Sequence, residues 1–121
     1  MKQYLISLAL LIAALVAFPT SHANAQSQAE MNRQAAKDFE KADAELNRTY
    51  AALKAKLPDA DSKRKLKKSQ RAWIAFRDAE AAFAADQVRG GSASPVLRWI
   101  SMTQTTEQRI KQFKADFPMA E

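Results

Sequence analysis

The chain has 121 residues, a formal net charge of +6, no cysteine and one histidine, His22. This composition leaves out the residues that thiol nucleophiles, Ser-His-Asp triads and Cys/His zinc sites require. The neighbouring carboxylates of Asp43 and Glu45, and of Asp78 and Glu80, are two positions apart on predicted helices and so point in different directions. They form neither a hydrolase pair nor a metal site, and we predict a non-enzymatic protein without a cofactor or a metal.

Residues 1–25 are predicted to be a cleaved signal peptide. Lys2 supplies a positive start, Tyr4 to Phe18 is an uncharged apolar run, and Ala23-Asn24-Ala25 matches an A-x-A cleavage site. The apolar run is shorter than the ~20 residues that a membrane-spanning helix needs. We therefore expect cleavage after Ala25, a periplasmic or secreted location, and one mature domain over residues 26–121 without a transmembrane helix.

The positive charge is concentrated in one segment. Removal of Lys2 would lower the net charge from +6 to +5, and residues 54–71 alone carry +6, against −1 for residues 26–53 and zero for residues 72–121. The run within this segment consists of Lys63, Arg64, Lys65, Lys67 and Lys68. It is either a patch for an anionic surface or the solvated start of a helix with Leu66 inward. We favour the solvated helix, because the run is short and lacks interleaved aromatic residues.

The first predicted helix runs from Met31 to Leu57. Apolar residues recur at steps of three and four, which indicates an amphipathic helix about 42 Å long. The set is Met31, Ala35, Phe39, Ala42, Leu46, Tyr50, Leu53 and Leu57. Pro58 ends the helix in the expected way.

A second helix is predicted to follow a short turn and to end near Gln87. Asp59, Asp61 or Ser62 can cap its start. Because so few residues connect the two helices, we expect them to form an antiparallel hairpin.

One face of the second helix is unusual because it mixes aromatic and polar side chains. Gln70, Trp73, Arg77 and Glu80 are spaced three, four and three residues apart and share one side. An arginine on such a face is expected to cross a half-buried seam and reach a carboxylate or an amide. We expect Trp73 to pack in the core.

A third helix is predicted after the two glycines of the chain, Gly90 and Gly91. Ser94 is the expected N-cap, Pro95 the first helical residue, and Pro118 the end. Its expected inner face comprises Val96, Ile100, Thr103, Thr106, Ile110, Phe113 and Phe117. No strand pattern appears, so the predicted fold is all-α: an antiparallel helical hairpin plus a third helix, forming a three-helix bundle.

Four short motifs occur in order along the chain: Leu46-Asn47-x-x-Tyr50, the segment from Gln70 to Glu80, Gly90-Gly91-Ser92, and Thr106-x-x-Arg109. Together they resemble the lysozyme inhibitor LprI-like family of small exported helical proteins. The resemblance covers nearly the whole predicted mature chain and implies a protein that binds a protein partner, with lysozyme as the candidate. Members of the family usually carry cysteines, and the aligned positions here are Gln34, Ala81 and Ser101. The chain would then be a cysteine-free variant.

The polar residues of these motifs have two interpretations, a binding surface or polar contacts between the helices. We favour contacts between the helices, because helical spacing directs these side chains toward one another. The predicted structural seam comprises Asn47, Tyr50, Gln70, Trp73, Arg77, Asp78, Thr106 and Arg109. For Trp99, an exposed partner-binding anchor and a core position are equally supported.

The loop Arg89-Gly90-Gly91-Ser92 is the candidate partner-binding element, together with Trp99. An arginine on a glycine-rich loop can pair with the two carboxyl groups in the cleft of a lysozyme. The alternative, which we favour, is a turn that needs a positive φ. Common animal lysozymes are themselves basic, so binding would also need a local acidic face, for example Glu40, Asp43 and Glu45.

Two functions are therefore expected from the sequence. The first is an exported binding protein that inhibits lysozyme by contact. The alternative is an envelope protein that binds anionic lipid or glycan through residues 54–71. A nucleic-acid partner does not fit the predicted exported location.

Overall fold

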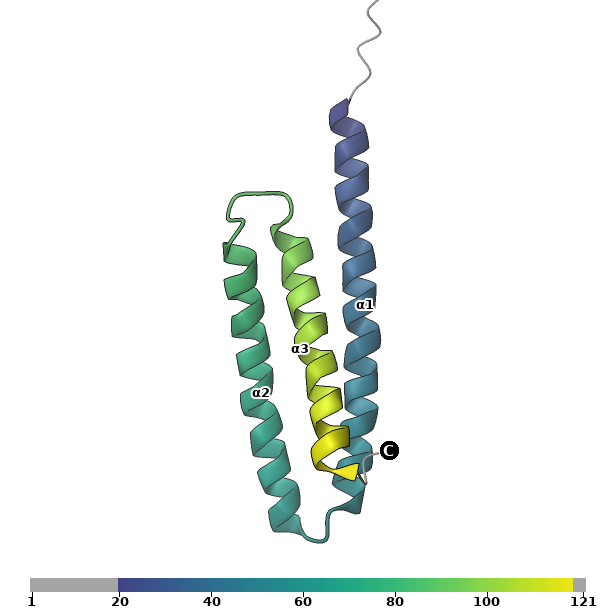
Figure 1. The fold of residues 1–121 in the computed structure, drawn as a ribbon, viewed down its shortest axis with the longest axis vertical. Coiled ribbons are helices and arrows are strands. Elements are labelled where there is room, and N and C mark those ends of the chain that lie inside the picture. Colours follow the sequence, from purple (N-terminus) through teal and green to yellow (C-terminus); the bar gives the residue numbers. More distant parts are fainter. Residues whose placement is uncertain (1–19, 119–121) are drawn as a thin grey trace, which may run out of the picture.

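The computed structural model describes residues 20–118 and contains three helices (Figure 1). They are α1 (Thr20–Lys56), α2 (Ala60–Asp86) and α3 (Ser94–Asp116), and no strand occurs within the described range. The all-α three-helix prediction is confirmed. Most of the predicted signal peptide lies outside the described residues, and cleavage after Ala25 stays a prediction.

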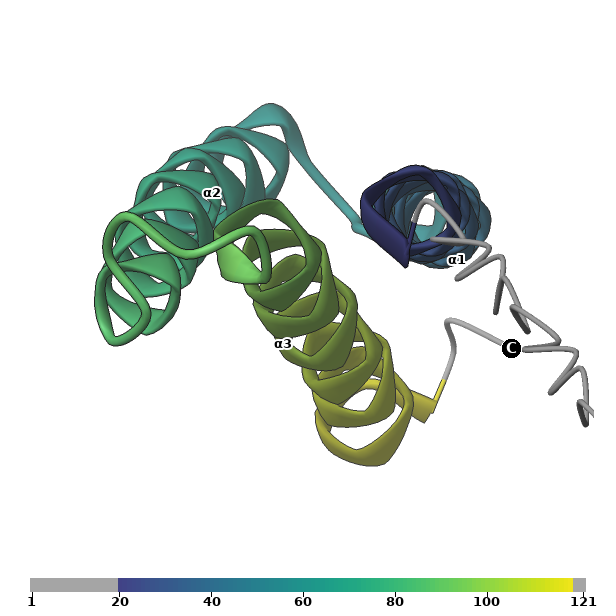
Figure 2. The ribbon, with the colours of Figure 1, turned by 90° about the horizontal axis from the view of Figure 1, so that it is seen from above.

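The third helix of the chain is the central one in space. α2 runs antiparallel to α1, as predicted, and α3 returns in the direction of α1 (Figure 1). α3 packs against both α1 and α2, whereas α1 and α2 make few contacts with each other. The view along the helices shows α1 and α2 diverging from their short connection, with α3 against both (Figure 2). The two helices of the expected hairpin therefore pack little against each other, and each packs against α3.

α1 begins earlier than the hydrophobic pattern predicts. It starts at Thr20, well before Met31, and its first turns extend beyond the start of α3 (Figure 1). These turns contain Ala, Gln and Glu, which favour helix without needing a packing partner. Hydrophobic spacing does not reveal these first turns of α1, because they bury no apolar face.

The apolar core joins α1 to α3. Leu46 and Leu53 of α1 meet Ile110 and Phe113 of α3, and all four are almost completely buried. The half-buried side chains that pack against them are Tyr50, Leu57, Leu66 and Trp73. The predicted inward position of Leu66 at the start of α2 is confirmed.

The inner face of α3 is wider than predicted. Ile100 and Phe117 were expected inside but are 39% and 40% exposed. The buried face of α3 also includes three residues outside the predicted face: Met102, Thr105 and Arg109. The reason is that α3 has neighbours on two sides, so its buried arc exceeds the single stripe of a surface helix.

The N-cap residue predicted from the sequence is confirmed for α2 but not for α3. Asp59 caps α2, and its carboxylate accepts a 2.7 Å hydrogen bond from the backbone N–H of Ser62. Ser94 was expected to cap α3, but Ala93 holds that position. The Ser94 hydroxyl donates instead to the carbonyl of Ala85, at 3.2 Å, and so connects the start of α3 to the end of α2.

Phe113→Ala tests the position of the core. Phe113 is 1% exposed, so the substitution is expected to lower the free energy of unfolding by about 3–5 kcal/mol. The control Phe117→Ala, four residues along the same helix at a position 40% exposed, should cost about 1 kcal/mol or less. Urea unfolding followed by circular dichroism measures both, and equal losses would contradict this core.

Candidate functional site

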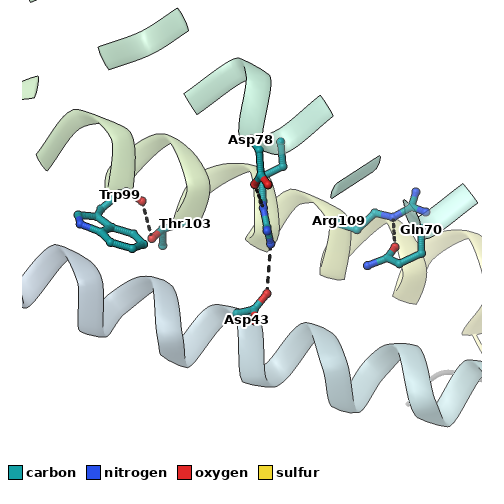
Figure 3. Close-up of polar contacts among 7 residues, drawn as sticks. Asp43, Gln70, Asp78, Trp99, Thr103 and Arg109 are labelled. Atoms are coloured by element: carbon teal, nitrogen blue, oxygen red, sulfur yellow. Dashed lines mark hydrogen bonds and ion pairs between the residues drawn. The ribbon is translucent and has the colours of Figure 1, made fainter. Parts of the chain in front are cut away.

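Arg77 crosses from α2 to α1 in the interior of the bundle. It is 8% exposed, its Nη1 donates to Asp43 Oδ1 at 3.1 Å, and its Nε donates to Asp78 Oδ1 at 3.0 Å. Figure 3 shows the two carboxylates at opposite ends of this contact, Asp78 on α2 and Asp43 on α1. As predicted, the arginine reaches a carboxylate across a half-buried seam.

The Arg77 guanidinium also contacts two aromatic rings. Its central carbon lies 5.1 Å from the centroid of Phe39 on α1 and 5.3 Å from that of Trp73 on α2. A cation this close to a ring face is attracted by the π electrons, more strongly where water is excluded. Arg77 therefore connects α1 and α2, two helices that make few other contacts with each other.

Arg109 makes the corresponding connection between α3 and α2. Its Nε donates to Gln70 Oε1 at 3.2 Å (Figure 3), and its Nη2 donates to Ser69 Oγ at 3.1 Å. Its Nη1 donates to Gln112 on its own helix, at 2.7 Å. Burial lowers the pKa of Arg109, opposed by the charge of Asp116.

Trp73 contacts both buried arginines. The Arg109 guanidinium carbon is 5.8 Å from the Trp73 ring and 4.3 Å from the Phe113 ring. We call the five residues Phe39, Arg77, Trp73, Arg109 and Phe113 the cation–aromatic seam. It contains residues of all three helices, and their side chains contact one another between the helices.

The remaining residues of the predicted polar seam fall into different environments. Tyr50 is half-buried against the core, and Thr106 is fully buried with no hydrogen-bond partner for its hydroxyl. Asn47 is exposed on α1 and is not brought into the seam. The sequence reasoning missed Asp43 as the partner of Arg77, although its position four residues after Phe39 places both on one side of α1.

Trp99 packs between helices and is half-buried. Its ring lies 5.4 Å from that of Phe39, which connects α3 to α1. The backbone carbonyl of Trp99 accepts a 2.9 Å hydrogen bond from Thr103 (Figure 3). The core interpretation of Trp99 fits this environment better than a free anchor does.

The loop between α2 and α3 presents Arg89 to solvent. The Arg89 side chain is 80% exposed and pairs with Asp86 through two contacts, Nε to Oδ1 at 2.8 Å and Nη2 to Oδ2 at 2.7 Å. The hydrogen bond to Asp86 raises the pKa of Arg89. Gly90 has a φ of +77°, so the turn requires the positive φ that was expected here.

The basic run occupies the first turns of α2. Arg64 and Lys65 pair with Asp61 of the same helix, whereas Lys67 and Lys68 are exposed. Lys63 is half-buried. Within these turns Leu66 packs against the core, and most of the basic side chains are open to solvent.

Neither a metal site nor a membrane-spanning helix is found in residues 20–118. No group of three or more acidic or histidine side chains in this range is placed to hold a metal ion. None of the three helices described is long and apolar enough to cross a membrane.

Comparison with known proteins gives a family and one similar relative. Residues 20–113 match the family model described as "Lysozyme inhibitor LprI". The chain is 38% identical over 109 residues to "Uncharacterized protein R02472" of Rhizobium meliloti (strain 1021), covering 80% of this chain and 78% of that protein. No solved structure matches the chain significantly.

Arg77→Lys tests whether the guanidinium holds α1 to α2. A lysine cannot donate to both Asp43 and Asp78 while lying flat against two rings, so we expect a loss of about 1–3 kcal/mol in unfolding free energy. The exposed Arg71, six residues earlier on α2, provides the control Arg71→Lys, with an expected change within about 0.5 kcal/mol. Equal stability of the two variants, measured by thermal unfolding, would show that the seam is not structural.

Proposed function

The chain belongs to the lysozyme inhibitor LprI family, and on this premise we propose that it is an exported, non-enzymatic protein that inhibits a lysozyme by direct contact. The observation that carries the proposal is the match of the family model to residues 20–113, which covers α1, α2 and most of α3. Export is supported by the apolar start of the sequence and the A-x-A site.

We place the contact on the loop of Arg89, Gly90, Gly91 and Ser92. The cation–aromatic seam is engaged inside the bundle, so its arginines cannot reach a partner without opening the fold. Arg89 is exposed at the turn between α2 and α3, and all residues of this loop are open to solvent. Arg89 is therefore a cation available to a carboxylate of another protein.

The pairing of Arg89 with Asp86 supports this role. Two parallel hydrogen bonds show that the guanidinium can adopt the bidentate geometry that suits a carboxylate. Ion pairs exposed to water contribute little to stability, so exchanging Asp86 for a carboxylate in a lysozyme cleft carries little cost. Lysozymes hold two carboxyl groups in that cleft, and a guanidinium between them would block the substrate.

The acidic face expected on α1 is less suited to the contact. Asp43 pairs with Arg77, and Glu45 Oε1 lies 3.7 Å from Lys114 Nζ. These two carboxylates are partly neutralised within the chain, which leaves Glu40 exposed beside them. Attraction to the basic surface of an animal-type lysozyme is correspondingly reduced, so the proposal depends on the loop and not on this face.

The anionic lipid or glycan partner is less favoured. The first part of α2 is basic, but residues 72–86 carry Asp78, Glu80 and Asp86 against Arg77 alone. A helix lying along an anionic surface would bring this acidic part against like charge.

Lysis of bacterial cell walls by lysozyme, followed with and without the purified protein, tests the proposal. Wild type is expected to slow lysis at micromolar concentration, and Arg89→Ala to raise the inhibition constant on the order of tenfold, equivalent to ~1.4 kcal/mol. Arg48→Ala removes the same charge from an exposed position on α1 and should leave inhibition unchanged.

The outcomes separate the function from its site. Undiminished lysis with wild type would overturn inhibition itself. Inhibition that is equal for wild type and Arg89→Ala would retain the function and overturn the loop as its contact.

A further inference from the structure

One side of α2 carries an apolar stripe that the bundle does not use. Ala72, Phe76, Ala79 and Phe83 are spaced four, three and four residues apart, which places them along one side of the helix. All four are exposed, Phe76 by 55% and Phe83 by 64%. We call these four residues the alanine–phenylalanine stripe.

The stripe lies away from the helices that α2 packs against. The residues of α2 that are buried in the bundle are Gln70, Arg77 and Ala81, on a different side of the helix. In the view along the helices, α2 lies at the edge of the bundle with one side turned away from α1 and α3 (Figure 2). Removing a phenylalanine side chain from water is favourable, so two exposed phenylalanines in one stripe favour a partner surface.

Large and small side chains alternate along the stripe, so the stripes of two copies can fit together. Consider two copies of α2 packed antiparallel, with a two-fold axis that crosses the helix at the level between residues 77 and 78. Phe76 then faces Ala79 of the second copy. The same axis places Phe83 opposite Ala72 of the second copy. Each phenylalanine then meets an alanine, which leaves room for a ring, and both matches arise from one symmetric register.

The charges along α2 favour the same orientation. Residues 60–71 carry a net charge of +5 and residues 72–86 carry −2. Antiparallel pairing in this register brings Asp86, at the end of each helix, beside the basic segment of the other, whereas parallel pairing would place basic against basic. In the register given by the stripe, Asp86 lies opposite Ser69 and within about one turn of Lys65 and Lys68 of the second copy.

We propose that the partner of the alanine–phenylalanine stripe is a second copy of this chain, joined by an antiparallel, two-fold symmetric α2–α2 contact. An anionic membrane is the other surface that a basic and aromatic helix can meet, but Asp86 lies on the same side as Phe83 and would face the lipid. The proposal is independent of lysozyme binding, because the stripe does not include the α2–α3 loop.

Sedimentation velocity of the purified protein, over a concentration series to about 100 μM, tests the dimer. Wild type is expected to change from one to two copies as concentration rises. Phe76→Gln combined with Phe83→Gln should stay monomeric with unchanged helix content, since both side chains are exposed in the single chain. The control Ile74→Gln replaces an apolar residue 39% exposed on the opposite side of α2 and should leave dimerisation intact.

A charge exchange tests the orientation of the helices. Lys65→Glu with Lys68→Glu is expected to weaken the dimer on the order of tenfold, and adding Asp86→Lys should restore part of the loss, because the exchanged charges again attract. A loss that Asp86→Lys deepens would overturn the antiparallel register. Wild type that stays monomeric throughout the concentration series would overturn the proposal. Monomeric protein that binds phosphatidylglycerol vesicles, and loses this binding when Phe83 is replaced, would also overturn it.

Discussion

The fold depends on two buried arginines that both contact one tryptophan. Arg77 and Arg109 come from different helices, and each places its guanidinium within 6 Å of the Trp73 ring centroid. The four buried residues of the apolar cluster come from α1 and α3, and Leu66 and Trp73 of α2 pack against them. The cation–aromatic seam adds specific contacts that connect α2 to both other helices.

The seam combines several interactions so that each buried charge is compensated. Arg77 has two carboxylates and two rings, and Arg109 has three neutral oxygen acceptors and two rings. Buried guanidinium groups without such partners would strongly oppose folding. A chain without cysteine has no disulfide to hold its helices, so specific polar contacts between helices carry that task here.

The sequence predicts much of this arrangement, and its failures have physical causes. Hydrophobic spacing, Asp59 and the prolines predict three helices and the turn before α2. The position of Arg77 beside Trp73 predicts an arginine that reaches a carboxylate, but Asp43 cannot be chosen among the acidic residues of α1 without the helix register. The central position of α3 is not predictable from a short α1–α2 connection, because connection length fixes direction and not packing. Ser94 is not the cap because α3 already begins at this residue, with Ala93 in the cap position, and the Ser94 hydroxyl donates to the Ala85 carbonyl.

The seam also determines which surfaces remain available to partners. Because its polar groups are satisfied internally, the α2–α3 loop and the outer side of α2 are left as distinct surfaces, one with an exposed cation and one apolar. If the seam joins α1 to α2, Arg77 and Asp43 act together across the interface of these helices. A double-mutant cycle of Arg77→Ala and Asp43→Ala, scored by unfolding free energy, measures this directly: a coupling of about 1–3 kcal/mol is predicted, and a coupling indistinguishable from zero would contradict it.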